Sequence, residues 1–137
     1  MTYLWTDAAG GMDMRFLLKR VYEPFSEDDG CRVLIDRLWP RGISKEAAGL
    51  DYWFKDVAPS PELRKWFCHK PELFPEFQNR YLQELRTDAQ KQALMEHLLD
   101  EAAKTNVTLV YGAKDPIYNH AVVLYEELQR LKGGAFE

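Results

Sequence analysis

The chain has 137 residues, of which 46% are hydrophobic, and a formal net charge of -4. This length suits one domain with one sizeable core, and the negative charge argues against a protein that coats nucleic acid through clustered cations. No apolar run approaches the roughly 20 residues of a membrane-spanning helix. Residues 1–14 lack the basic start and the apolar middle of a signal peptide. We therefore expect a cytoplasmic protein with no membrane partner, and the sequence leaves its oligomeric state open.

The cysteines and the distribution of charge indicate which ligands the chain could bind. Cys31 and Cys68 are too far apart for a Cys-x-x-Cys motif and too few for a disulfide framework or a zinc cage. We therefore expect two reduced thiols, no metal site and no cofactor. Residues 31–70 include eight Lys or Arg residues and five Asp or Glu residues, which gives a local net charge of +3. An anion is expected to bind in this central segment.

The first half of the chain predicts three strands. We treat residues 1–14 as a loosely ordered extension outside the fold. Phe16 to Arg20 is typical of a short buried strand. An uninterrupted apolar run predicts a central strand from Cys31 to Leu38, covered on both faces as in parallel sheets. The link between these strands is barely long enough for a crossover, so an antiparallel pair is the alternative. The aromatic segment from Asp51 to Lys55 predicts a third strand.

Capping residues and prolines indicate where helices begin. The strongest signal is Ser60-Pro61-Glu62, in which a capping hydroxyl precedes a proline at the first helical position and an early carboxylate. Val107 to Tyr111 predicts the last strand. Five helices are expected, with starts at Ser44, Ser60, Pro71, Thr87 or Asp88, and Asp115.

Strands separated by helices predict an α/β fold. Crossing from one parallel strand to the next needs a connection of helix size. We expect a small, mostly parallel sheet flanked by helices in Rossmann-like layers, with about four strands and five helices. Residues 15–137 would form this single domain.

Unusual residues follow the predicted strands, where open parallel sheets bind their ligands. Basic residues follow the first strand, residues 36–42 follow the second, and residues 111–115 follow the last. Guanidinium groups, an indole and a helix N-terminus suit a phosphate, a carboxylate or a nucleotide. The ligand-binding candidates are Arg20, Arg37, Trp39, Arg41, Arg64, His69, Tyr111 and Asn119.

His120 is the candidate general acid or base, because imidazole transfers protons near neutral pH. Asp36 or Asp115 would orient it. The class of reaction would be hydrolysis or group transfer. The sequence contains no Gly-rich phosphate loop, no Ser nucleophile elbow and no set of residues with metal-ligand spacing.

Each candidate also has a structural interpretation. Asp36 and Arg37 could form an internal ion pair that fixes a loop. Trp39 could be a core residue, Arg64 could lie on a solvated helix face, and His120 could cap a helix or fill the core. Cys68 and His69 form a poor nucleophile–base pair, because neighbours in a helix point about 100° apart.

Five strings of residues carry a family likeness: Lys19-Arg20-Val21-Tyr22, Arg37-Leu38-Trp39-Pro40-Arg41-Gly42, Ala58-Pro59-Ser60, Glu62-Leu63-Arg64-Lys65-Trp66-Phe67 and Asn119-His120-Ala121. They resemble the YeaO-like family, also catalogued as domain of unknown function 488, over about residues 14–131. The Leu-Trp-Pro-Arg-Gly string is the most specific of them. The resemblance implies a small bacterial cytoplasmic α/β protein with no established activity.

The wider set of that family has a Leu-Cys-Ala-Glu-like string after the last strand and a Cys-His-Arg start to the following helix. Here the matching positions read Leu109-Val110-Tyr111-Gly112-Ala113 and Asn119-His120-Ala121. The cysteines, the glutamate and the arginine are missing, and only His120 carries over. Thiol-dependent chemistry is therefore not expected from this resemblance.

Together, these observations favour a pocket for a phosphorylated or carboxylated small molecule, or a nucleotide. Arg20, Arg37 and Arg41 would bind the anionic group. Trp39 and Tyr111 would form flat aromatic walls of the pocket. The alternative is a module without catalysis that binds nucleic acid or a protein through the basic central segment.

Overall fold

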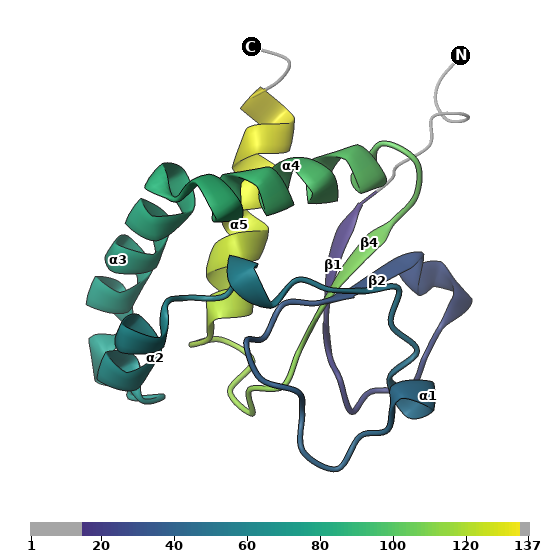
Figure 1. Ribbon diagram of the computed structural model, residues 1–137, viewed down its shortest axis with the longest axis horizontal. Helices are drawn as coiled ribbons and strands as arrows, with labels where there is room; N and C mark the ends of the chain where they lie inside the picture. Colours follow the sequence, from purple (N-terminus) through teal and green to yellow (C-terminus); the bar gives the residue numbers. More distant parts are fainter. Residues whose placement is uncertain (1–14, 135–137) are drawn as a thin grey trace.

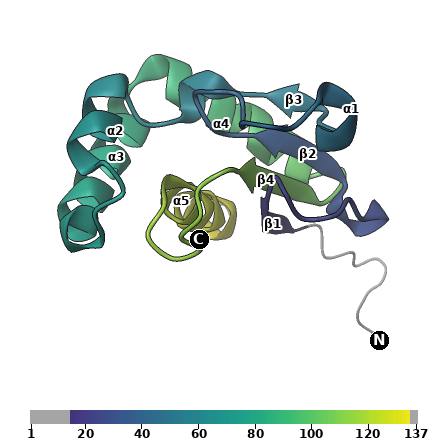
Figure 2. The same ribbon diagram turned by 90° about the horizontal axis from the view of Figure 1, so that it is seen from below.

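Four parallel strands form one sheet in the order β1-β4-β2-β3 (Figures 1 and 2), and Figure 2 labels all four. The strands are β1 (Phe16–Arg20), β2 (Cys31–Leu34), β3 (Tyr52–Trp53) and β4 (Val107–Tyr111). The computed structural model describes residues 15–134, so the expected extension at residues 1–14 lies outside the described residues. The predicted α/β class is confirmed. The antiparallel alternative for β1 and β2 is wrong, because both strands pair in parallel with β4, which lies between them.

Helices cover the sheet unequally (Figures 1 and 2). On one face, α4 (Ala89–Ala102) and α5 (His120–Gly134) contact the strands, while α3 (Phe74–Thr87) and α2 (Pro61–Phe67) pack beyond them. The short α1 (Lys45–Ala48) lies over the other face, where Ala48 packs with a small apolar cluster. No helix within residues 15–134 is both long and apolar enough to cross a membrane.

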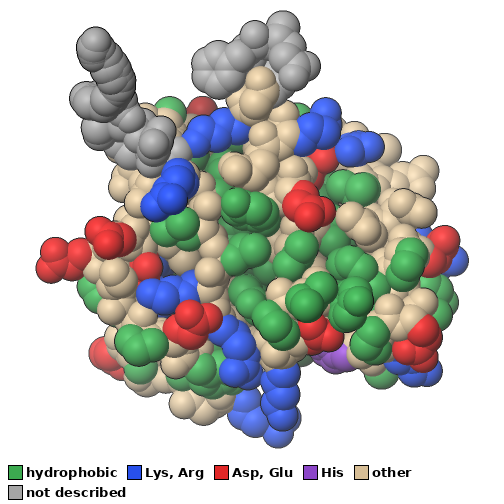
Figure 3. All heavy atoms as spheres, turned by 180° about the vertical axis from the view of Figure 1, so that it is seen from behind, with side chains coloured by type: hydrophobic (Ala, Val, Ile, Leu, Met, Phe, Trp, Pro, Cys, Tyr) green, Lys and Arg blue, Asp and Glu red, His purple; other side chains and the backbone are tan. Residues whose placement is uncertain are grey.

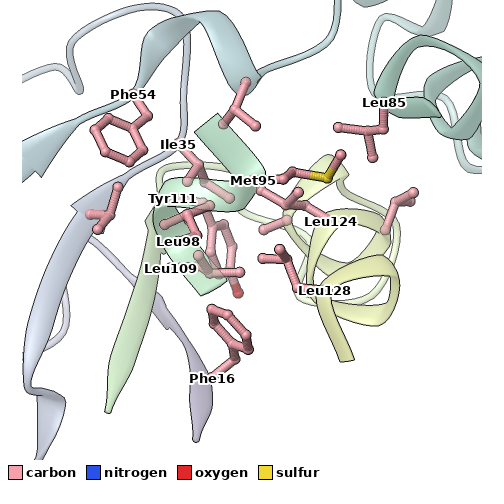
Figure 4. Close-up of a cluster of buried hydrophobic side chains, with 14 of the residues drawn as sticks. Phe16, Ile35, Phe54, Leu85, Met95, Leu98, Leu109, Tyr111, Leu124 and Leu128 are labelled. Carbon is pink, nitrogen blue, oxygen red and sulfur yellow. The ribbon is translucent and has the colours of Figure 1, made fainter. Parts of the chain in front are cut away.

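The main core lies between the sheet and the helices α4 and α5 (Figure 4). Side chains alternate along each strand, so every second residue of a strand faces these helices. Burial of this apolar face is the main force that holds the helices to the sheet. Phe16 and Leu109 of the strands, together with Ile35 just after β2, meet the helix side chains Met95, Leu98, Leu124 and Leu128 in this core.

The ends of some elements differ from the sequence prediction. Strand β2 ends at Leu34 rather than Leu38, and α5 begins at His120 rather than Asp115. Asp115 closes a turn instead, because its Oδ1 accepts hydrogen bonds from the amides of Ile117 (2.9 Å) and Tyr118 (3.1 Å). The helix start at Ser60 is confirmed, and its hydroxyl accepts a hydrogen bond from the amide of Leu63.

A buried carboxylate joins α3 to α5. Glu127 is 3% exposed and accepts paired hydrogen bonds from Arg86 and Arg130, at 2.8–3.1 Å. The hydrogen bonds from Arg130 and Arg86 lower the pKa of Glu127 from 4.5 to about 2. Because the carboxylate is stabilised in the folded state, it contributes stability that is present above pH 4.5 and is lost as the pH falls toward 2.

We expect Glu127→Gln to remove this pH dependence. At pH 7 the free energy of unfolding of the variant should be lower than that of wild type by on the order of 2 kcal/mol. This value is smaller than the full pKa change implies, because solvent screens the half-exposed arginines. At pH 2.5 the difference from wild type should largely vanish. Urea denaturation at both pH values measures it, with the exposed neighbour Glu126→Gln as control. A constant difference at both pH values would contradict the account.

Candidate functional site

A cavity of about 280 Å³ opens at the carboxyl-terminal edge of the sheet. The loops that follow β2 and β4 meet there, at the lower edge of Figure 1, beside α2. Parallel strands bring the ends of β1, β2 and β4 to the same edge, which is why segments distant in sequence share one cavity. Eight of the predicted site residues line it: Asp36, Arg37, Trp39, Arg41, Arg64, His69, Asn119 and His120.

Three predicted site residues do not line the cavity. Arg20 turns its guanidinium Nε to the carbonyls of Gly112 (3.4 Å) and Ala113 (3.0 Å), so it supports the loop after β4. Tyr111 is 6% exposed and belongs to the main core. Asp115 is occupied in the turn before α5. The assignments of Arg20, Tyr111 and Asp115 to the site are therefore corrected.

Arg37 is a wall of the cavity rather than a free cation. Its guanidinium lies 3.4 Å from the Asp56 carboxylate and donates to the carbonyls of Ala58 (3.4 Å) and Pro59 (3.3 Å). The buried Lys91 donates to the carbonyls of Asp56 (2.9 Å) and Ala58 (2.8 Å) in the same segment. The ion pair anticipated for Arg37 thus exists, with Asp56 as the partner instead of Asp36.

Arg41 and Arg64 are free to receive an anion. Within residues 15–134, neither guanidinium takes part in a hydrogen bond, an ion pair or a ring contact. The Tyr22 hydroxyl donates to the Arg41 carbonyl (2.9 Å), which fixes the backbone of the loop after β2. Arg64 lies in the last turn of α2. Figure 3 shows Lys and Arg side chains gathered at the lower edge of the molecule, the edge where the cavity opens.

Asp36 and His120 form a pair beside the cavity. The Nε2 of His120 lies 2.9 Å from the Ile35 carbonyl and 3.3 Å from Oδ1 of Asp36. The other Asp36 oxygen accepts from the amide of Gly112 (3.0 Å), while Oδ1 is buried and has no further partner. Because both neighbours of Nε2 are acceptors, Nε2 must carry the proton. In the neutral ring, Nδ1 is then the atom with a free lone pair.

His69 reaches the cavity through an unusual turn. Cys68 (φ 48°) and His69 (φ 56°) are the non-glycine residues with left-handed backbone conformations in the described part of the chain. Each such residue costs on the order of 1 kcal/mol. The turn ends α2 and leaves Cys68 as an exposed free thiol that does not line the cavity.

Asn119 has a structural role at the start of α5. Its Oδ1 accepts from the amide of Val122 (3.0 Å), and its Nδ2 donates to the Asp115 carbonyl (2.6 Å). This N-cap places His120 at the first helical position, next to Asp36.

Sequence reasoning missed the apolar half of the lining. Leu38, Phe67 and Phe77 border the cavity together with the charged residues. The regular spacing of Phe77 along α3 predicts only a core position, and it is indeed 2% exposed. Leu38 lies inside the specific Leu-Trp-Pro-Arg-Gly string, and this position in the motif was the signal that could have identified it as a lining residue.

We expect Lys91→Met to loosen the cavity wall. The substitution removes the donor to two carbonyls, so the free energy of unfolding should fall by about 2 kcal/mol. Thermal denaturation measures this change, with the exposed Lys65→Met as control. Equal melting temperatures for the two variants would show that the Lys91 contacts do not stabilise the fold.

We also expect neutral His120 to carry its proton on Nε2. Two-dimensional long-range ¹H–¹⁵N spectra of the neutral ring, recorded at alkaline pH, distinguish the two tautomers. His69, which has no polar contact among the described residues, provides an internal reference for a tautomer mixture. A predominant Nδ1–H form at His120 would refute the assigned geometry.

Comparison with known proteins identifies relatives along most of the chain. The family model described as "Inactive DUF488-N3 subclade" matches residues 15–132. The uncharacterized protein YeaO of Escherichia coli is 45% identical over 118 residues, which cover 86% of this chain and 100% of that protein. The uncharacterized protein Rv3073c of Mycobacterium tuberculosis is 45% identical over 116 residues, 85% of this chain and 95% of its own length.

No solved structure is significantly similar to this fold. The family match covers the sheet, the helices and every segment that contributes to the cavity. The chain therefore belongs to the YeaO-like DUF488 family, in the subclade described as inactive DUF488-N3.

Proposed function

We propose that the protein binds a phosphorylated or carboxylated small molecule in this cavity and does not transform it covalently. The observation that carries the proposal is the pair of guanidinium groups, Arg41 and Arg64, that border one cavity without partners among the described residues. Guanidinium groups bind phosphate and carboxylate oxygens through paired hydrogen bonds. Arg37 is balanced by Asp56, and the lining then keeps Arg41 and Arg64 against the single carboxylate of Asp36, so the local field also attracts anions.

The lining chemistry argues for binding rather than catalysis. None of the described side chains that border the cavity is Ser, Thr, Cys or Lys, so the groups that could attack a substrate are limited to a carboxylate, a phenol hydroxyl and two imidazoles. The Tyr22 hydroxyl already donates to a carbonyl. Thiol chemistry was not expected from the family resemblance, and the matching subclade is itself described as inactive. Hydrolysis or group transfer would depend on His69, on His120 and on the Asp36 carboxylate, whose oxygens already contact Gly112 and His120.

The size of the cavity favours a small ligand. Pockets for drug-sized molecules measure roughly 300–1,000 Å³, so a cavity of about 280 Å³ suits a mononucleotide or a smaller molecule. A nucleic-acid strand would need an extended groove with clustered cations. The small-molecule proposal is therefore better supported than the nucleic-acid alternative.

Isothermal titration calorimetry with inorganic phosphate and a panel of phosphorylated and carboxylated metabolites tests the proposal. We expect Arg41→Ala and Arg64→Ala each to weaken binding about tenfold or more, because a hydrogen bond to a charged group contributes about 1.5–3 kcal/mol. Arg15→Ala is the matched control, since this exposed arginine precedes β1 at the opposite edge of the sheet. If the two site variants bind every anion as the control does, the proposal is wrong.

A further inference from the structure

We infer that the ligand is an anion with an apolar, aromatic body, and that hydroxyl-rich anions such as sugar phosphates are disfavoured. This inference rests on the proposed function, because it assumes that Arg41 and Arg64 receive the anionic group. It concerns the remainder of the ligand, which the rest of the cavity must accommodate.

Most polar side chains of the cavity are already engaged within the protein. The Trp39 indole nitrogen donates to the Ile43 carbonyl (2.7 Å), which leaves only the ring as a possible contact. Both polar atoms of the Asn119 side chain bind within the start of α5. The Tyr22 hydroxyl and Nε2 of His120 each bind a carbonyl.

The carboxylate of Asp36 also offers a ligand few free hydrogen-bond acceptors. One of its oxygens accepts from Gly112, and the other is buried against His120. A ligand hydroxyl would therefore lose its hydrogen bonds to water and find, apart from the arginines, only His69 and Nδ1 of His120 as uncommitted side-chain partners. Burial of a polar group without a partner is unfavourable, so hydroxyl groups on the ligand oppose binding.

Apolar side chains line the cavity together with the charged groups. The rings of Phe67 and Phe77 border the cavity and stack with centroids 4.2 Å apart and an interplanar angle of 19°. Leu38 borders it too and is 61% exposed, so it would gain from being covered by a ligand. Figure 3 shows hydrophobic side chains next to the basic ones at this edge of the molecule. A flat apolar group on the anion fits this lining.

Calorimetry of the full chain with three probes tests the inference: inorganic phosphate, glycerol 3-phosphate and phenyl phosphate. We expect phenyl phosphate to bind at least tenfold more tightly than the other two. Equal affinity for phosphate and phenyl phosphate, or a preference for glycerol 3-phosphate, would overturn the inference and leave the proposed function intact. No binding of any probe at low ionic strength would count against both.

Variants locate the apolar contact. Leu38→Ala should weaken binding of phenyl phosphate about threefold to tenfold and leave binding of inorganic phosphate unchanged. Ile117→Ala is the matched control, because Ile117 is also 61% exposed and does not line the cavity. Phe67→Leu is a second variant that keeps the site apolar while removing the ring. If neither Leu38→Ala nor Phe67→Leu discriminates between the two probes, the inferred contact is wrong.

Discussion

The parallel pairing of β1 and β2 on either side of β4 determines where every loop after a strand must lie. Phe16 and Cys31 both pair with Val107, so the two strands that flank β4 start level with each other along it. Their carboxyl ends then emerge together, and the loops that carry Asp36, Arg41 and His120 meet at one edge. Without this register the cavity would not exist, because no local element contains enough of its residues.

Burial also requires a partner for each charged group inside the fold. Charged groups that leave the core need partners, and several of the basic residues are used in this way. Arg32 is 1% exposed and binds the Asp29 carboxylate (2.6 Å) together with the carbonyls of Ala48 and Gly49. Arg37 and Lys91 support one wall of the cavity. The positive charge of the central segment is therefore partly structural, and Arg41 and Arg64 are the cations of that segment that line the cavity without a charged partner among the described residues.

The sequence was sufficient for the fold class, because periodic apolar residues, capping residues and strand-sized apolar runs are local signals. Eight of the residues that the sequence suggested for a site also line one cavity, since motifs after parallel strands converge by topology. The partner of each charge was not predictable. In the sequence, Arg20, Arg37 and Arg41 are all arginines that follow a strand. Only the folded positions of the backbone carbonyls show that Arg20 and Arg37 are bound within the protein, whereas Arg41 is free. The prediction of where α5 begins was wrong for a similar reason. Asp115 and Asn119 are both residues that favour helix N-caps, but Asp115 closes the preceding turn and Asn119 caps the helix.

Chemical-shift mapping of the labelled protein during titration with phenyl phosphate tests the central claim most directly. The account predicts that the largest changes in backbone amides fall in residues 36–41, 64–69 and 112–120, around the cavity. Large changes confined to the surroundings of Arg86 and Arg130, or to the opposite edge of the sheet near Arg15, would contradict it.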